Sequence, residues 1–550
     1  MKNILLLFHI LVFLQLPAQE NLTTKQWQED LRFLQTTVHK DYPFLFVKTT
    51  KEIFDTEVET LYKNIPDLEE HEVIVGISRI IALFEYGHSD IGFNQKPFEF
   101  HYLPINLYEF SDGVYLQGVH NNYSEAIGAK VIEINNIPIV EALERIRPAV
   151  NVENDQYFKA YGINYLRILE VLHAQGITDK LENSIELTLE KDGKLFTQSF
   201  KALPKGETVP TKYSHVWKDE NWLEARNQST TPLYLKNLDK IYFFEHLPQE
   251  KALYVRHSQI QDDPEEDISS FYARVFDFIE NNDVEKLILD VRLNGGGNNF
   301  LNKDIITGII ETEKINKVGS FFVIIGRRTF SACQNLVNEL DNYTNVIFVG
   351  EPTAENINFY GDARPVPLPN SKIPVYLSFA WWQDKPAWQN AEWIAPSIPV
   401  TMDFEEYTSN QDPVLDAALN FSGSDFKPDP MQYITDLYLA GKMQELAQEV
   451  PRMIQDPRYS FFNFEAELTK SGYFLLHSGR PEEVQGGIQI FLFITQVFPN
   501  SANSWKNLGE AYLKVGDKNQ AVKFLEKAIV LDSDGEIGKS AKEMLKHIKK

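Results

Sequence analysis

Cysteine is almost absent from this sequence of 550 residues, in which Cys333 is the single example. One cysteine excludes an internal disulfide framework and any metal site built from several thiolates. Basic residues are also scarce, since 53 Lys and Arg stand against 78 Asp and Glu and the net charge is −25. Nucleic acids and anionic membranes bind clustered basic side chains, so we expect neither as a partner.

Several motifs of well-known enzymes are missing as well. The chain has no Gly-x-Ser-x-Gly segment and no His-Glu-x-x-His segment. These would mark a nucleophile elbow and a zinc site, respectively. The Gly-x-Gly-x-x-Gly spacing of dinucleotide-binding turns fails at Phe300. We therefore predict no metal and no cofactor.

Long apolar runs are absent after the first residues of the chain. The N-terminus has Lys2, an apolar stretch from Ile4 to Leu16, and a small residue, Ala18, at a plausible cleavage site. This order is typical of a secretory signal peptide, and the stretch is too short to span a bilayer comfortably. We expect residues 1–18 to be removed and the mature chain to be periplasmic or secreted, without membrane insertion. A buried first helix is the alternative.

The remaining composition is that of a globular protein, with 43% hydrophobic and 24% charged residues. At roughly 100–200 residues per domain, the length predicts several domains. Residues 19–98 have apolar side chains at three- and four-residue steps, which predicts an N-terminal helical domain. Residues 99–155 predict a small β-rich unit with strands near 113–119 and 128–136. It either binds an extended peptide on its sheet edge or is a plain structural module.

Residues 156–240 form a mixed connecting region that we do not interpret further. Residues 241–425 alternate apolar strands with helices: strands at 287–291, 321–325 and 346–349 enclose helices at 300–311 and 331–340. This alternation predicts an α/β unit with a parallel sheet buried on both faces.

Residues 426–550 are again helical. The pattern Trp505-x2-Leu508-Gly509-x2-Tyr512, followed by Ala521, Phe524 and Ala528, matches the tetratricopeptide (TPR) repeat. We therefore predict a TPR-like helical domain. It either docks a protein partner or only shields a flank of its neighbour.

Two segments of the α/β unit carry the candidate chemistry. Ser331 lies between a buried strand and a helix, where its hydroxyl either caps the helix or faces a ligand at the carboxyl edge of the sheet. The second segment ends in the turn 295–297, three glycines whose backbone amides are open to a substrate carbonyl. The amides of Gly296 and Ala332 are the candidate oxyanion hole.

Three segments, in this order, resemble the S41 peptidases, which include the C-terminal processing proteases and the tricorn-like proteases. They are Asp290-x-Arg292-x-Asn294-x-Gly296-Gly297, Thr329-Phe330-Ser331-Ala332 and Val349-Gly350-Glu351-Pro352-Thr353. Later landmarks are Leu368-Pro369-Asn370-Ser371, Pro396-x-Ile398-x-Val400 and Asp412-Pro413-Val414-Leu415. Tyr86-Gly87-His88-Ser89 resembles the segment before the PDZ position in many relatives. The resemblance implies a multidomain α/β fold in which 99–155 is PDZ-like and 241–425 is the S41-type catalytic core.

The resemblance also implies site residues, with Ser331 as the nucleophile. The processing proteases activate this serine with a lysine, but Asn356 stands at the lysine position and cannot accept a proton. The tricorn-like branch uses a histidine at the position of His88, whose imidazole titrates near neutral pH. The alternative is a helix-end or core histidine. For the third group, which orients the ring, Glu392 is the first candidate and Glu351 the second.

Two functional hypotheses follow. The first is an exported serine peptidase that hydrolyses proteins or peptides through Ser331 and His88, with a further partner docking on the TPR-like region. The second is an inactive S41-like scaffold that binds peptides without turnover, which the missing lysine motivates. They differ in whether the His88 imidazole lies within hydrogen-bond reach of the Ser331 hydroxyl.

Overall fold

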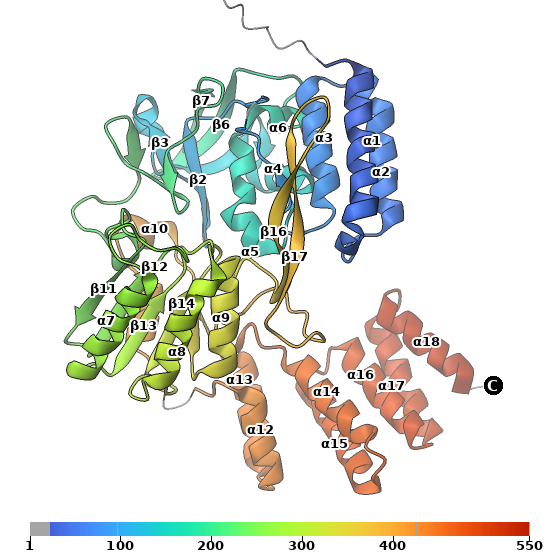
Figure 1. The fold of residues 1–550 in the computed structure, drawn as a ribbon. Helices are drawn as coiled ribbons and strands as arrows, with labels where there is room; N and C mark the ends of the chain where they lie inside the picture. The colour runs from blue at the N-terminus through green and yellow to red at the C-terminus, as the bar shows by residue number, and fades with distance from the viewer. Residues whose placement is uncertain (1–21, 96, 424–425, 549–550) are drawn as a thin grey trace, which may run out of the picture.

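The structure is a computed structural model that describes residues 22–95, 97–423 and 426–548. The predicted signal peptide lies outside these residues. No helix within the described ranges is both long enough and apolar enough to cross a membrane. Figure 1 shows a helical region and a β-rich region above a second α/β region, with a further group of helices at the C-terminal end.

Three helices open the described chain: α1 (Thr24–Asp41), α2 (Lys51–Asn64) and α3 (Glu70–Ala82). Their apolar stripes are buried as the spacing predicts, with Trp27, Leu31 and Leu34 all in the core. A side-chain cap from Thr23 begins α1. The chain leaves the helical pattern after α3 and forms a short strand, β1 (Asp90–Ile91).

The β-rich region is a seven-stranded sheet in which β10, β3, β4, β6 and β7 follow one another, while β2 pairs with β3 and β5 with β4. The strands are β2 (Ile105–Phe110), β3 (Gly113–His120), β4 (Lys130–Ile134), β5 (Ile137–Pro138), β6 (Ser184–Lys191), β7 (Lys194–Lys201) and β10 (Trp222–Glu224). Strands β6, β7 and β10 come from 156–240, so the sheet extends beyond the 99–155 unit expected from the sequence. Three helices share a hydrophobic core with this sheet: α4 (Ile139–Ile146), α5 (Asp155–Ala160) and α6 (Leu169–Ala174). One hydrophobic core joins this sheet to α1–α3, so the two regions pack as one unit.

The predicted parallel sheet is present. Its order is β11-β12-β13-β14-β15-β18, and all neighbours are parallel except β11 and β12. The strands are β11 (Tyr242–Leu247), β12 (Ala252–His257), β13 (Lys286–Asp290), β14 (Phe321–Ile325), β15 (Ile347–Gly350) and β18 (Ile398–Pro399). One face packs on α7 (Ile268–Asn281), α8 (Lys303–Glu311) and α9 (Ala332–Tyr343), which lie in front of the sheet in Figure 1.

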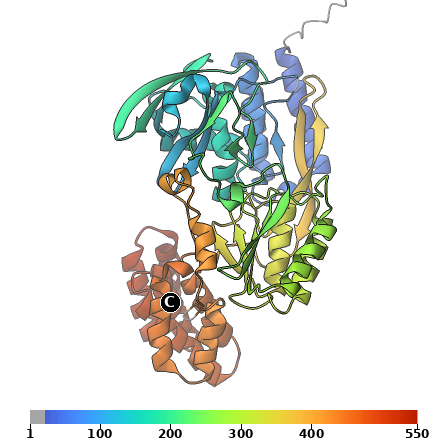
Figure 2. The same ribbon diagram turned by 90° about the vertical axis from the view of Figure 1, so that its left-hand side faces the viewer.

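The other face of this sheet shares a core with helices that follow it in the sequence. These are α11 (Pro413–Leu419), α12 (Pro430–Leu439), α13 (Met443–Gln455), α14 (Phe464–Leu476), α15 (Pro481–Val497), α16 (Ala502–Lys514) and α17 (Lys518–Leu531). The chain ends in α18 (Glu536–Ile548), and Figure 2 shows the group from α12 onward below the two sheets. Trp505 stacks on Phe524 with ring centroids 5.9 Å apart, so these two residues of the predicted repeat pattern pack together.

A long hairpin connects the two sheets. It consists of β16 (Asn358–Pro367) and β17 (Pro374–Gln383), and Figure 1 shows it running upward beside α3. Strand β17 pairs with β1, and the Ser378 N–H donates to the Ser89 hydroxyl over 3.0 Å. The residues just after α3 are therefore fixed to the chain that follows β15, which brings His88 toward the parallel sheet.

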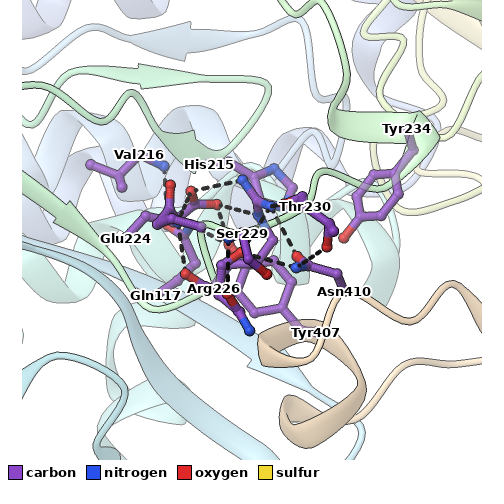
Figure 3. Close-up of polar contacts among 12 residues, drawn as sticks. Gln117, His215, Val216, Glu224, Arg226, Ser229, Thr230, Tyr234, Tyr407 and Asn410 are labelled. Atoms are coloured by element: carbon purple, nitrogen blue, oxygen red, sulfur yellow. Dashed lines mark hydrogen bonds and ion pairs between the residues drawn. The ribbon is translucent and has the colours of Figure 1, made fainter.

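A second, much shorter hairpin reaches toward the same place. It consists of β8 (Thr211–Lys212) and β9 (His215–Val216), joined by Tyr213 and Ser214. Figure 3 shows the polar network at its base, where the Val216 N–H donates to Gln117 Oε1 over 3.0 Å. Gln117 in turn donates over 2.6 Å to the hydroxyl of Tyr407 on α10 (Phe404–Thr408). The network holds the hairpin between β3 and α10.

Short 3-10 segments complete the described elements. They are Pro43–Leu45, Ile65–Asp67, Asn121–Ala126, Arg147–Ala149, Gly162–Arg167, Leu233–Leu235, Asn299–Asn302 and Pro457–Tyr459. The segment at Asn299–Asn302 occupies the start of the helix predicted from residue 300, so α8 begins at Lys303.

Gly297 is a position where the fold requires glycine. Its φ is +143°, and a Cβ there would lie 2.1 Å from the Ile260 carbonyl oxygen. Gly297→Ala should therefore destabilise the protein by about 2–3 kcal/mol, through backbone strain and this clash. Gly193→Ala is the matched control, because Gly193 also has a positive φ but nothing lies within 4 Å of an added Cβ. Thermal unfolding of both variants measures the difference, and equal midpoints would contradict the assignment.

Candidate active site

Ser331 occupies the first turn of α9, at the carboxyl edge of the parallel sheet. Its backbone has φ +56° and ψ −129°, a conformation that is uncommon outside glycine and is found at strained functional positions. No side-chain hydrogen bond from Ser331 caps α9, so the capping interpretation does not apply. Ser331 is half-buried.

His88 lies next to this hydroxyl, with its Nε2 atom 2.9 Å from Ser331 Oγ. The ring is held between Phe330 and Phe359, at centroid distances of 4.5 Å and 6.0 Å. Burial lowers the pKa of His88, which favours the neutral imidazole. The structure thus brings together the two residues that the motifs paired across 243 positions of the sequence.

Glu355 is the carboxylate nearest to the other side of the imidazole. Its Oε1 atom lies 3.1 Å from His88 Nδ1, and its Oε2 atom accepts a hydrogen bond from the Ser331 N–H. The carboxyl is fully buried, and burial raises its pKa. No sequence motif singles out Glu355, although it directly precedes Asn356, the residue at the lysine position of the processing proteases. Nothing in its local pattern distinguishes it from neighbouring acidic residues.

The two carboxylates predicted for this place lie elsewhere. Glu392 is exposed, and its backbone carbonyl, not its side chain, accepts a hydrogen bond of 2.6 Å from Asn154. Glu351 forms an ion pair with Arg327 at 2.6 Å. The carboxyl group expected beside the imidazole is therefore corrected from Glu392 to Glu355, because the chain turns after β15 and directs residue 355 back toward Ser331.

Asn356, at the predicted lysine position, faces a second buried carboxyl group. Its Nδ2 atom donates to Glu153 Oε1 over 2.8 Å, and the Gly87 N–H donates to Glu153 Oε2 over 2.8 Å. Glu153 thereby fixes the backbone next to His88. Burial raises the pKa of Glu153 to about 8, and the nearby Glu355 carboxylate contributes to the shift. Glu153 lies in no motif, so no pattern in the sequence indicates a role for it.

The raised pKa of Glu153 makes stability depend on pH. Between pH 4.5, which is the ordinary pKa of a glutamate, and about pH 8, the folded protein keeps the Glu153 proton while the unfolded chain releases it. The free energy of unfolding therefore falls as the pH rises through this window. Glu153→Gln should remove the effect, at the cost of one acceptor. Relative to wild type, its melting temperature should therefore rise from pH 5 to about pH 8 and level off above it. Thermal unfolding across this range tests it, with exposed Glu392→Gln as control. A pH-independent difference would contradict the prediction.

The glycine turn lies directly against the nucleophile. A Cβ on Gly296 would be 2.5 Å from Ser331 Cβ, which explains the glycine at this position. The Gly296 N–H donates to Asn294 Oδ1 over 2.9 Å, so it is already engaged and the donor role predicted for it needs correction. Among the described residues, no acceptor is found for the amides of Gly297 and Ala332. These two amides are the better candidates for an oxyanion hole.

A cleft of about 420 Å³ opens beside the turn. Its lining includes all three glycines 295–297, Phe330 and Gly87, and the side chains of Tyr157, Tyr161, Tyr213 and Arg328. The cleft therefore adjoins the site through the glycine turn and Phe330. Within the part of the chain that the structure describes, no group of three or more His, Cys, Asp or Glu side chains is placed to hold a metal ion.

Comparisons with known proteins bear on the fold. No family model matches the sequence, and no curated protein matches it. A crystal structure of a serine-to-alanine mutant of CPAF matches with a TM-score of 0.52 at 11% identity, covering 74% of this chain and 99% of that one.

Other solved structures are matched at lower scores. The photosystem II D1 C-terminal processing protease gives 0.33 at 12% identity, covering 72% of this chain and 98% of that one. A putative S41 protease from Bacteroides fragilis gives 0.30 at 14% identity, covering 60% and 84%. The chain therefore shares the fold of CPAF over about three quarters of its length, 74%.

Proposed function

We propose that this protein is a serine peptidase that cleaves peptide bonds by acyl transfer, with Ser331 as nucleophile and His88 as general base. The observation that carries the proposal is the distance of 2.9 Å between His88 Nε2 and Ser331 Oγ. This is hydrogen-bond reach, as proton transfer requires. The same distance favours an enzyme over the inactive scaffold, for which no such contact is needed.

The reaction follows from the positions of these groups. Ser331 Oγ attacks the carbonyl carbon of the peptide bond, and its proton passes to His88 Nε2. The imidazolium then gives this proton to the leaving amine as the carbon–nitrogen bond breaks. Water, deprotonated by His88, attacks the acyl-enzyme, and the proton returns to Ser331 as the acid product leaves. A neutral resting imidazole, favoured by burial, is ready for the first step.

Glu355 is the proposed orienting group. Its Oε1 atom lies 3.1 Å from His88 Nδ1, and a proton on Nδ1 directed at this oxygen would leave Nε2 as the acceptor. It also stabilises the imidazolium that forms during each proton transfer. The second bond to Glu355, from the Ser331 N–H, ties the carboxylate to the nucleophile's own backbone.

The substrate carbonyl oxygen becomes negatively charged as Ser331 Oγ attacks, and hydrogen-bond donors must stabilise this charge. The amides of Gly297 and Ala332 are proposed for this role, since neither has an acceptor among the described residues. Both flank the nucleophile, Ala332 as the next residue and Gly297 through the turn against which Ser331 packs. Preorganised backbone donors of this kind stabilise the tetrahedral intermediate without reorganisation.

Peptide hydrolysis is tested with the purified mature protein on casein and on a defined mixture of synthetic peptides, with products identified by mass spectrometry. The expected result is a set of cleaved bonds that is lost in Ser331→Ala. Cleavage that persists in Ser331→Ala, at the same sites and rate, would contradict the assignment.

Export of this protein and docking of a protein partner on its C-terminal helices are also proposed. Removal of residues 1–18 and delivery outside the cytoplasm would be tested by N-terminal sequencing of the protein from cell fractions, with cleavage after Ala18 expected. A role of the helices from residue 426 in docking a protein partner rests on the repeat pattern at 505–528.

A further inference from the structure

Three arginines directly follow strands β13 and β14 at the carboxyl edge of the parallel sheet, and two of them are neutralised. Arg292 forms an ion pair with Asp290 at 2.8 Å, and Arg327 pairs with Glu351 at 2.6 Å. Arg328 forms no ion pair with any carboxylate in the described parts of the chain. An uncompensated guanidinium in a partly buried position is unusual, because such charges are costly without a partner.

The guanidinium of Arg328 is nevertheless held firmly. Its Nη1 atom donates to Ser214 Oγ over 2.6 Å, and the group lies over the Tyr161 ring at 5.1 Å. Its Nε atom is buried and has no hydrogen-bond partner among the described residues. Arginine has five N–H donors, so most of them remain available on a side chain whose position is already fixed.

The hairpin that supplies Ser214 adopts a strained conformation at its tip. Tyr213 and Ser214 have φ values of +52° and +68°, in a two-residue turn where glycine or asparagine is usual. The backbone carbonyl of Tyr213 lies 3.0 Å from Nδ1 of His215, a residue that Figure 3 shows in the polar network. The strain is therefore maintained by the surrounding structure, and it places Tyr213 on the cleft wall and Ser214 against Arg328.

Arg328 is also close to the nucleophile. A Cβ on Gly295 would lie 3.5 Å from Arg328 Nη2, and a Cβ on Gly296 would lie 2.5 Å from Ser331 Cβ. Consecutive Cα atoms are about 3.8 Å apart, so the charge and the nucleophile contact adjacent residues of one turn. Arg328 lines the cleft of about 420 Å³ together with this turn, and so does Phe330, the residue directly before Ser331.

We propose that Arg328 binds a carboxylate of the substrate within about one or two residues of the cleaved bond. The planar guanidinium matches a carboxylate through paired N–H···O bonds. The carboxylate is either an Asp or Glu side chain or the C-terminal carboxylate of the peptide. This inference rests on the proposed peptidase function and narrows its substrates to peptides with a negative charge at the cleavage site.

The test uses matched synthetic peptides in one mixture. In one set of pairs, the two peptides differ only in carrying Glu or Gln at a position near a central bond. In the other set, the two peptides differ only in ending in a free carboxylic acid or an amide. Wild type should cleave the carboxylate-bearing member of a pair about 10- to 100-fold faster. The Glu/Gln arm reports a side-chain carboxylate, and the acid/amide arm reports the C-terminus. Arg328→Gln should abolish the preference, Arg328→Lys should retain part of it, and exposed Arg364→Gln should leave it unchanged.

A second readout separates this inference from the peptidase assignment. Labelling of Ser331 by a small neutral fluorophosphonate needs the nucleophile and its base but no carboxylate, so its rate should be similar in wild type and Arg328→Gln. Carboxylate peptides should slow this labelling more than their neutral partners, in wild type only. Equal profiles of wild type and Arg328→Gln, or no carboxylate preference in wild type, would overturn the role of Arg328. Absence of both labelling and cleavage would overturn the peptidase function, and this inference with it.

Discussion

His88→Ala is expected to lower kcat/KM for peptide cleavage by about 10⁴- to 10⁶-fold, to the level of Ser331→Ala. The reason is the contact of 2.9 Å between His88 Nε2 and Ser331 Oγ, which leaves the hydroxyl without a base when the ring is removed. The two residues act on one proton, so the double variant should be no slower than either single one. Initial rates on a cleaved peptide, with folding checked by thermal unfolding, measure the effect.

The control for this variant is His477→Ala, which removes an exposed imidazole from the C-terminal helices and should leave the rate unchanged. If His88→Ala kept more than about a tenth of the wild-type rate, His88 would not be the base. If the double variant were much slower than both single variants, the two side chains would be acting independently.

Glu355→Gln is expected to lower kcat by about 10³- to 10⁴-fold with little change in KM. The Glu355 carboxyl lies against two potential donors, since it accepts a hydrogen bond from the Ser331 N–H and lies 3.1 Å from His88 Nδ1. Glutamine has a single side-chain acceptor oxygen, so one of these donors would face an NH2 group and the imidazole would lose its fixed tautomer. Steady-state kinetics on the same peptide separate kcat from KM.

Glu392→Gln is the matched control, because it makes the same chemical change at the carboxylate that the sequence favoured. Glu392 is exposed, so this variant should have wild-type kinetics. The reverse pattern, a slow Glu392→Gln and a normal Glu355→Gln, would restore the sequence-based choice and remove Glu355 from the site.

The sequence predicted the elements that carry the site better than the contacts between them. The strands at 287–291 and 321–325 and the helix after Ser331 have strong local patterns, and the structure places them as β13, β14 and α9 within a residue or so. Ser331 and His88 were selected because each lies in a short segment of the S41 pattern. Their approach to 2.9 Å depends on the β16–β17 hairpin, which the sequence analysis did not predict.

Glu355 could not be chosen from sequence for a physical reason. Glu351, Glu355 and Glu392 all lie in or near the S41-like segments of the sequence. They differ in burial and in the direction that the chain takes after β15, and neither property follows from the local sequence. Glu351 is neutralised by Arg327, Glu392 is exposed, and Glu355 is buried against the imidazole. The Gly296 amide was misassigned for a similar reason, since its bond to Asn294 Oδ1 forms only when the turn folds back on itself.

The extent of the β-rich region was also underestimated. Strand β6 alternates clearly between apolar and polar residues, whereas β7 does not, and most of β7 is exposed or half-buried. Strand β6 pairs with β4 and β7 pairs with β6, and no local pattern reveals that β6 pairs with the distant β4.

The most direct measurement is the mass of the purified protein after reaction with a fluorophosphonate, combined with peptide mapping. A single adduct on Ser331 is predicted for wild type, with labelling slowed by several orders of magnitude in His88→Ala and absent in Ser331→Ala. Equal labelling of wild type and His88→Ala, or an adduct on a different residue, would contradict the assignment of Ser331 and His88 as nucleophile and base.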